Sequence, residues 1–232
     1  MVELTEIANE QSKNTAFISQ RRLDVDHAKD IAVYMVKGLL SAALRKKQKL
    51  EQQISARFEE VRKQFGIQPY LSIPPIVASL RNCNFGGTNL NVKALKTEQG
   101  ETVAFKIFLN PGDTLWVVDG QHRRKGIQYV KEFLDYIQTY HKYPLKGPLA
   151  IYKYATKEDL GSEELQIWAD CLEQLRACTV AIEVHLGLDE NQERQLFHDL
   201  NNYGKKVDKS LALRFDASNP VNNFIVSDLI DG

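Results

Sequence analysis

The amino-acid sequence predicts a mixed α+β fold, because some segments carry apolar side chains at helical spacing while others alternate or cluster them as strands do. The chain has 232 residues, of which 43% are hydrophobic and 26% are charged, a composition typical of globular proteins. A chain of this length can bury a substantial core in one domain. We therefore expect a single domain over residues 1–232, with a helical elaboration at about 24–66.

The N-terminal part is expected to contain one short strand followed by a helix. Residues 15–20 are rich in strand-forming side chains. Either Asp24 or Asp26 can cap the helix that follows, which we expect to end at about Gly38. Its apolar face would consist of Ile31, Tyr34, Met35 and Leu39.

A second helix is predicted from Ser41 to Phe65, where apolar residues recur every three or four positions. Gly66 follows at the position where a C-cap belongs. A cluster of basic residues lies on this helix, and it would be either a solvated face or a contact with the DNA backbone: Arg45, Lys46, Lys47 and Lys49.

The middle of the chain is expected to supply strands. Residues Ile76–Leu80, Thr102–Leu109 and Thr114–Val118 are rich in β-formers, and the last two are separated by the turn sequence Pro111-Gly112-Asp113. With a further strand at Ala177–Leu186, the fold should contain about five strands.

The remaining predicted elements are mainly helical. A helix should run from Asp119 to about Tyr140, a second over Ser162–Leu175 and a third over Asp189–Leu200. Pro220 marks another helix start. The chain ends at Asp231-Gly232 without a clear terminal element, which fits a C-terminally truncated protein.

Composition excludes several classes of protein and favours a cytoplasmic location. No apolar stretch approaches the length of a membrane span, and the polar N-terminus does not resemble a signal peptide. The three cysteines look like reduced thiols, and the histidines have no shared spacing that suggests a metal site. The formal net charge is zero, so any surface that binds nucleic acid must be local.

The most informative stretch is LWVVDGQHRRKG at residues 115–126, where an apolar strand passes into a helix. The first turn of a helix exposes N–H groups and carries partial positive charge, which favours an anion. Gln121, His122 and Arg123 add polar and cationic side chains there, and Gly120 lets the backbone approach a ligand closely. These residues predict a phosphate-binding turn.

A second cluster follows the helix that is expected to end near Asn201 and Asn202. The loop after it contains Gly204, Lys205 and Lys206, and it offers amide groups and two cations in a small space. It is either a plain connection with a solvated lysine pair or a place where Asn201 and a nearby lysine help to hold the same ligand.

Three sequence features together resemble the DGQHR-domain family, which includes DndB-like proteins of DNA sulfur modification. They are DGQHR at Asp119–Arg123, F-x-x-L-N at Phe197–Asn201 and K-S-L at Lys209–Leu211. The resemblance covers Gln20 to the end of the chain, and it extends more distantly to the ParB/sulfiredoxin-like superfamily. It implies a ParB/sulfiredoxin-like domain with added helices.

The resemblance also implies a role in DNA phosphorothioation, with DNA binding, transcription regulation and contacts to DNA-modification enzymes. By the same resemblance Gly120, Gln121, His122 and Arg123 would contact phosphate. Asp119 would cap the helix or position a metal-bound water as the catalytic residue, and Arg22 would add a further basic group. A nucleoside triphosphate with Mg²⁺ is the implied cofactor, and we expect a homo-oligomer.

Three functions fit these features. The first, which we favour, is a regulatory DNA-binding protein of a DNA modification system, with a nucleotide or a DNA phosphate at the DGQHR turn. The second is a ParB-like NTPase switch; because the sequence has no Walker motif, any hydrolysis should be slow. The third is a scaffold that docks onto modification enzymes and in which the motif is only structural.

Overall fold

The computed structural model of the chain describes residues 3–6, 23–81, 83 and 91–202. These residues form two compact units. The first contains the described parts of Met1–Arg22, Pro74–Gln121 and Val180–Gly204, and the second contains Leu23–Ile73 and His122–Thr179. Helices and two small sheets together make a mixed α+β fold, which confirms the predicted fold class. The single-domain organisation expected from the sequence stays a prediction.

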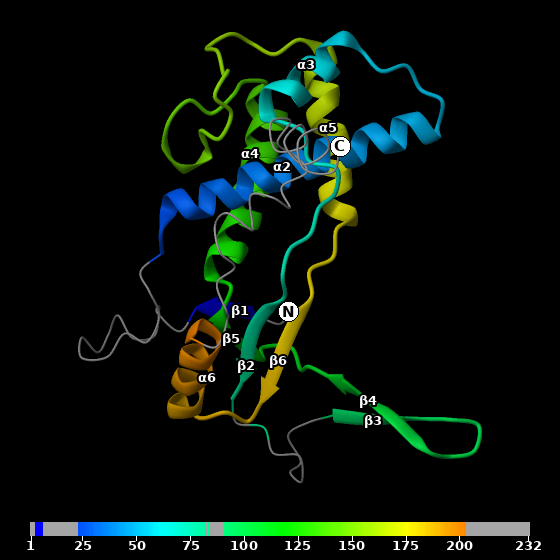
Figure 1. Cartoon of the computed structure of the whole chain (residues 1–232), viewed down its shortest axis with the longest axis vertical. Coiled ribbons are helices and arrows are strands. Elements are labelled where there is room, and N and C mark those ends of the chain that lie inside the picture. Colours follow the sequence, from blue (N-terminus) through cyan, green and yellow to red (C-terminus); the bar gives the residue numbers. More distant parts are fainter. Residues whose placement is uncertain (1–2, 7–22, 82, 84–90, 203–232) are drawn as a thin grey trace, which may run out of the picture. The chain divides into compact units, whose positions relative to one another are not determined.

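The first unit is built on a four-stranded sheet with the order β1-β5-β2-β6 (Figure 1). The strands are β1 (Glu3–Glu6), β5 (Thr114–Asp119), β2 (Ile76–Leu80) and β6 (Ile182–Leu186). Strand β2 is antiparallel to β5 and parallel to β6, while β1 is parallel to β5. All five residues of β2 are buried, as an apolar central strand requires. The predicted strands at 76–80 and 114–118 are confirmed, whereas β1 was not predicted.

Helix α6 (Glu190–Asn202) packs on β5, and an ion pair ties the same helix to the end of β2. Arg81 donates from Nε and Nη2 to the two carboxylate oxygens of Glu193, at 2.9 and 2.7 Å. Glu193 is only 2% exposed, and the Arg81 guanidinium lies 4.3 Å from the centre of the Trp116 ring. A charge buried this deeply is tolerated because its partner is bidentate.

Strands β3 (Asn91–Lys96) and β4 (Thr102–Phe108) form a separate antiparallel ribbon. The sequence predicted β4 but not β3. The turn at residues 110–113 joins β4 to β5, which belongs to the other sheet. Its backbone is closed by the Asp113 N–H, which donates to the Asn110 carbonyl at 3.1 Å, and Gly112 has φ 94° as the predicted turn requires.

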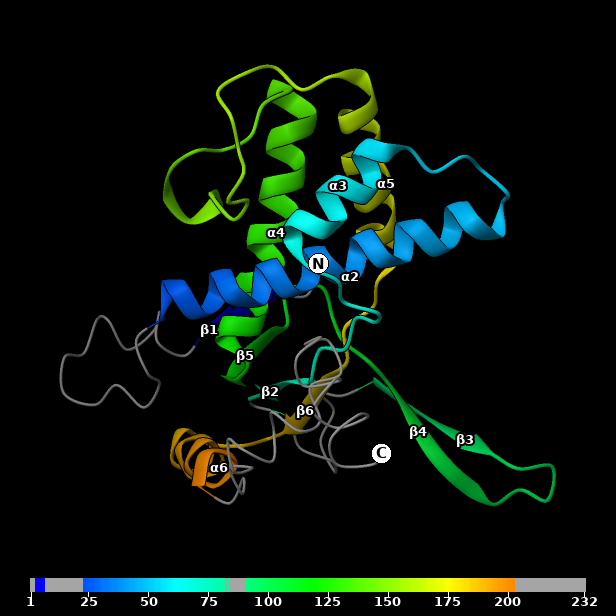
Figure 2. The same ribbon diagram turned by 45° about the horizontal axis from the view of Figure 1, so that its top comes forward.

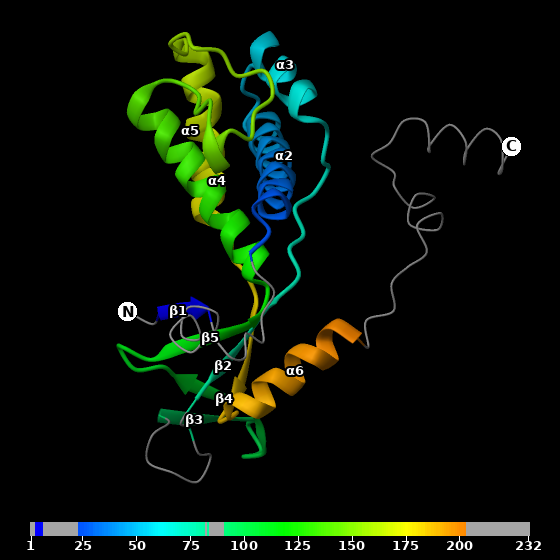
Figure 3. The ribbon, with the colours of Figure 1, turned by 90° about the vertical axis from the view of Figure 1, so that its left-hand side faces the viewer.

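The second unit is helical, with α2 (Val25–Lys49) running across α4 (Gln121–Tyr140) and α5 (Ser162–Ala177), as Figure 2 shows. Helices α4 and α5 lie side by side (Figure 3), and the Phe133 and Trp168 rings meet edge to face at 5.3 Å. A short 3₁₀ helix at Gly147–Leu149 lies in the connection between them. The large side chains that are fully buried in this core include Met35, Leu39, Leu40, Phe58, Val61, Phe133, Leu134, Ile137 and Trp168.

The predicted helix boundary at Gly38–Ser41 is wrong, because α2 continues without a break to Lys49. Gly38 is needed for packing, because a Cβ at this position would lie 2.9 Å from the Cβ of Leu71. The glycine therefore allows the segment around Leu71 to pass close to the helix. The helix ends instead before Glu51, which has φ 53°. Helix α3 (Ala56–Phe65) then starts at the Ser55 cap and ends at the predicted Gly66 cap.

No helix in the described ranges combines the length and the apolar character needed to cross a lipid bilayer.

The ion pair in the first unit leads to a stability prediction. We expect Glu193→Gln to lower the free energy of unfolding by about 2 to 4 kcal/mol, because it removes the buried carboxylate from Arg81. Glu190 is the matched control: its carboxylate is 3.8 Å from the same guanidinium and 59% exposed. Glu190→Gln should cost less than about 1 kcal/mol. Urea denaturation measures both, and equal losses would contradict the structural importance of the buried pair.

Candidate functional site

The DGQHR segment lies where strand β5 passes into helix α4, as the sequence predicts. Strand β5 ends at Asp119, Gly120 follows with φ 101°, and α4 begins at Gln121. Such a φ is strained for any residue with a side chain, so glycine permits the sharp change of direction here. Gln121 is 6% exposed, whereas Asp119 is half-buried. The boundary between the two units falls directly after Gln121.

His122, the first residue of the second unit in this segment, contacts the start of α2. Its Nε2 accepts the backbone N–H of Asp24 at 3.0 Å. The His122 ring also meets the His27 ring edge to face, with centroids 5.0 Å apart. To accept this hydrogen bond Nε2 must carry no proton, so the neutral ring bears its hydrogen on Nδ1. The contact therefore defines both the orientation and the tautomer of His122.

Asp24 is the N-cap of α2, as the sequence allowed. Its Oδ1 accepts the backbone N–H groups of Asp26 and His27, at 3.0 and 3.1 Å. The hydrogen bond from the backbone N–H of His27, together with that from Asp26, lowers the pKa of Asp24 below its ordinary value, although desolvation opposes this. The cap is strongest while Asp24 is ionised and weakens as the pH falls through this lowered pKa.

The first turn of α4 differs from that of α2 because it contains no acidic side chain. The run of side chains from His122 through Arg123 and Arg124 to Lys125 is instead polar and cationic, and all of them are half-buried. Lys125 donates to the Gln128 side chain at 3.0 Å and lies 5.2 Å from the centre of the Tyr129 ring. Cations at a helix start oppose the helix dipole, so this turn gains from a nearby anion.

Helices α2 and α4 approach each other closely one turn further along. A Cβ on Gly126 would lie 2.6 Å from Cγ2 of Ile31 and 3.1 Å from the carbonyl oxygen of Ala28. Only a residue without a side chain fits at this crossing. Because Gly126 is one turn from His122, the crossing holds the beginnings of the two helices together.

The other predicted site residues are in different places. Arg22 and Lys205 lie outside the described residues, as does the side chain of Asn202. Asn201 belongs to the first unit, where its Nδ2 donates to the Phe197 carbonyl of the same helix at 2.7 Å. The proposed roles of these residues, and that of Asp119, stay predictions.

The described residues contain no group of three or more His, Cys, Asp or Glu side chains placed to hold an ion.

Sequence reasoning missed the role of His27 and the link between His122 and Asp24. His27 and His122 lack the spacing typical of metal ligands, and no other local pattern connects them. The signal that could have found the link is the aspartate cap at Asp24 together with a histidine in the first turn of another helix. The 98 positions between the partners make the pairing invisible to local patterns.

Together the fold and this turn define an α+β protein with a cationic helix start after a strand. The DndB family model, described as DNA-sulfur modification-associated, matches residues 1–230. The chain belongs to this family. No curated protein and no solved structure matches it.

The close helix crossing predicts a specific sensitivity to added volume. Gly126→Ala should destabilise the protein by about 1 to 3 kcal/mol through overpacking, even though alanine favours helices by about 1 kcal/mol. Gly161→Ala is the matched control, since nothing lies within 4 Å of a Cβ built there. It should change the unfolding free energy by only about 0.5 kcal/mol. Urea unfolding of both variants measures the difference, and a neutral Gly126→Ala would contradict the crossing.

Proposed function

We propose that this DndB-family chain is a regulatory protein of DNA sulfur modification that binds DNA through a backbone phosphate at the first turn of α4. The family match supports an association with a DNA modification system. The observation that carries the proposal is the first turn itself, which joins His122, Arg123, Arg124 and Lys125 without an acidic residue. Charge-assisted hydrogen bonds from arginine and lysine side chains to phosphate are short and strong.

The neighbouring helix supports this assignment. The start of α2 is occupied by the Asp24 carboxylate, which accepts two of its N–H groups. Among the described residues, the first turn of α4 contains no acidic side chain, whereas Asp24 caps α2 and Asp26 lies in the first turn of α2. An incoming phosphate would be attracted to α4 and would gain from both the side chains and the helix dipole. Gly120, directly before this turn, and Gln121, its first residue, would bring the backbone close to the same phosphate.

Regulation would follow from binding at promoter or modified DNA, with modification enzymes as further partners. A formal net charge of zero gives the whole chain no general attraction to DNA. Affinity would then depend on local cations, and it should fall steeply with salt in proportion to the number of phosphates contacted. We propose that the protein acts as a homo-oligomer, so that two such turns would engage one duplex.

The second candidate is a nucleotide-dependent switch of the ParB type, with slow hydrolysis. The observation that favours it is the order of strand, Gly120 and helix, an arrangement that suits a nucleotide's phosphates. In that case Mg²⁺ would bridge the triphosphate, and Asp119 would position a bound water. Isothermal titration with ATP, GTP and CTP tests it: micromolar binding that Arg123→Ala abolishes would support the switch, and no heat with any of the three would exclude it.

The DNA-binding proposal predicts a selective effect of one cation. Arg123→Ala should weaken binding to a labelled duplex about tenfold and lower the slope of log affinity against log salt by about one. Arg176→Ala is the matched control, because it removes the same charge from an exposed position in the last turn of α5. It should leave both quantities unchanged.

Mobility shifts across a salt series measure the affinities, and thermal unfolding midpoints show whether each variant is folded. A folded Arg123→Ala protein with the affinity of the unaltered chain would overturn the phosphate site. Absence of any shift at low salt would overturn DNA binding altogether.

A further inference from the structure

A groove with a volume of about 490 Å³ lies in the second unit, beside the end of α4 and the connection that follows it. Its apolar side is formed by Tyr136 from α4 and by Tyr143 and Leu149 from the connection. Lys142, Lys146 and Lys157 also line it. A groove with aromatic walls and a cationic edge suits a ligand that is both planar and anionic.

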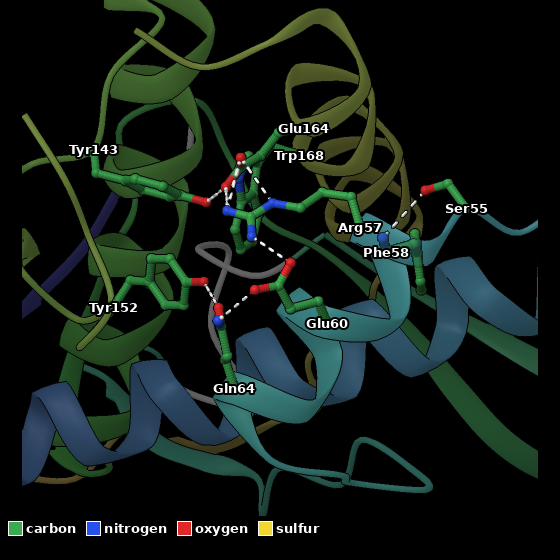
Figure 4. Close-up of polar contacts among 9 residues, drawn as sticks. All are labelled: Ser55, Arg57, Phe58, Glu60, Gln64, Tyr143, Tyr152, Glu164 and Trp168. Atoms are coloured by element: carbon green, nitrogen blue, oxygen red, sulfur yellow. Dashed lines mark hydrogen bonds and ion pairs between the residues drawn. The ribbon is translucent and has the colours of Figure 1, made fainter. Parts of the chain in front are cut away.

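The base of the groove is held rigidly by a buried polar network (Figure 4). Tyr143 is 3% exposed, and its hydroxyl donates to the Glu164 carboxylate while accepting the indole N–H of Trp168 at 3.1 Å. Arg57 in turn donates to both oxygens of Glu164, each at 3.0 Å. Burial, followed by the hydrogen bond to Glu164 and its charge, raises the pKa of Tyr143, which therefore stays protonated. The network therefore holds Tyr143, and with it part of the apolar side of the groove, in one orientation.

The part of the connection that forms the groove is basic. Residues 140–157 contain four lysines and neither Asp nor Glu, and the acidic residues Glu158 and Asp159 follow directly. Three of these lysines line the groove, and Lys142 pairs with Asp159 at 3.1 Å, with both side chains exposed. Within the described part of the chain, Lys146 and Lys157 make no ion pair. Two ammonium groups are therefore available to an anion in the groove.

An aromatic platform completes the site. The half-buried ring of Tyr136 packs against Tyr140, with centroids 4.6 Å apart, and Tyr140 is 61% exposed. Exposed tyrosines beside lysines are the combination with which proteins bind unpaired nucleotides, by stacking on the base and pairing with the phosphate. Tyr143 is buried and the lysines are exposed. The groove therefore offers an apolar interior to the base of a nucleotide and cationic groups at its edge to the phosphate.

We propose that this groove binds a nucleotide unit, with its phosphate at Lys146 and Lys157 and its base against Tyr136. The nucleotide would be either a free nucleoside phosphate or an unpaired nucleotide of a DNA strand. The site is distinct from the first turn of α4 and does not depend on the function proposed for that turn. Arg123→Ala should therefore leave it intact.

The test uses the full chain and three probes: a fluorescein-labelled oligothymidylate, thymidine 5′-triphosphate and inorganic phosphate. In fluorescence anisotropy the double variant Lys146→Ala/Lys157→Ala should lose at least about tenfold in affinity for the oligothymidylate, and the salt slope should fall by about 0.7 for each lysine removed. Lys153→Ala is the matched control, since Lys153 is exposed on the same connection but does not line the groove. The affinity of the Lys153→Ala protein for the oligothymidylate should stay within about twofold of that of the unaltered chain.

A second pair of variants tests the base contact. Tyr136→Leu should weaken oligothymidylate binding about tenfold, whereas Tyr154→Leu should not, because Tyr154 is exposed outside the groove. Competition by the triphosphate at similar concentration would identify a free nucleotide as the ligand, and binding of the oligothymidylate alone would identify a strand.

Several results would overturn the proposal. They are unchanged binding by the folded double lysine variant, an equal loss in Lys153→Ala, inorganic phosphate that competes as well as the triphosphate, and no binding of any probe by the unaltered chain. Thermal unfolding midpoints confirm that the variants are folded, which is expected because both substituted lysines are exposed.

Discussion

The close crossing of α2 and α4 is the constraint on which the candidate site depends. Gly126 has no room for a side chain against Ile31 and Ala28, so the two helix backbones are in contact there. One turn earlier, His122 accepts the N–H of Asp24. A packing contact and a hydrogen bond thus hold the first turn of α4 beside the start of α2. Without the crossing, neither the orientation of His122 nor the position of the following arginines would be defined.

The starts of α2 and α4 lie close together but carry side chains of different charge. The Asp24 carboxylate caps α2, whereas α4 begins with polar and cationic side chains only. Cations at a helix start cost stability, and an anionic ligand would reverse that cost. We propose a DNA phosphate as this anion, which is consistent with membership of a family associated with DNA-sulfur modification. The groove beside Tyr136 also presents cationic side chains to an anionic ligand, but its lysines lie on the connection after α4 and not at a helix start.

Local signals made part of this structure predictable from the sequence. The apolar runs at 76–80 and 114–118, the break at Gly120 and the caps at Asp24 and Gly66 all act within a few residues, and each is confirmed. The sequence did not predict a continuous α2, because a glycine such as Gly38 favours a helix end by propensity. In the structure Gly38 lies inside the helix, where the lack of a side chain leaves room for Leu71. The pairing of His122 with Asp24, and the gathering of Tyr136 with distant lysines, depend on tertiary packing, so no spacing in the sequence could reveal them.

Hydrogen–deuterium exchange of the full chain, with and without duplex DNA, tests the central claim most directly. The first backbone N–H groups of a helix have no partner within that helix, so their exchange responds to a ligand that binds them. The account predicts slower exchange in the peptide containing residues 121–126 when DNA is added, and no such change in the Arg123→Ala protein. Unchanged exchange in that peptide, under conditions where the DNA is bound, would show that the phosphate is held elsewhere.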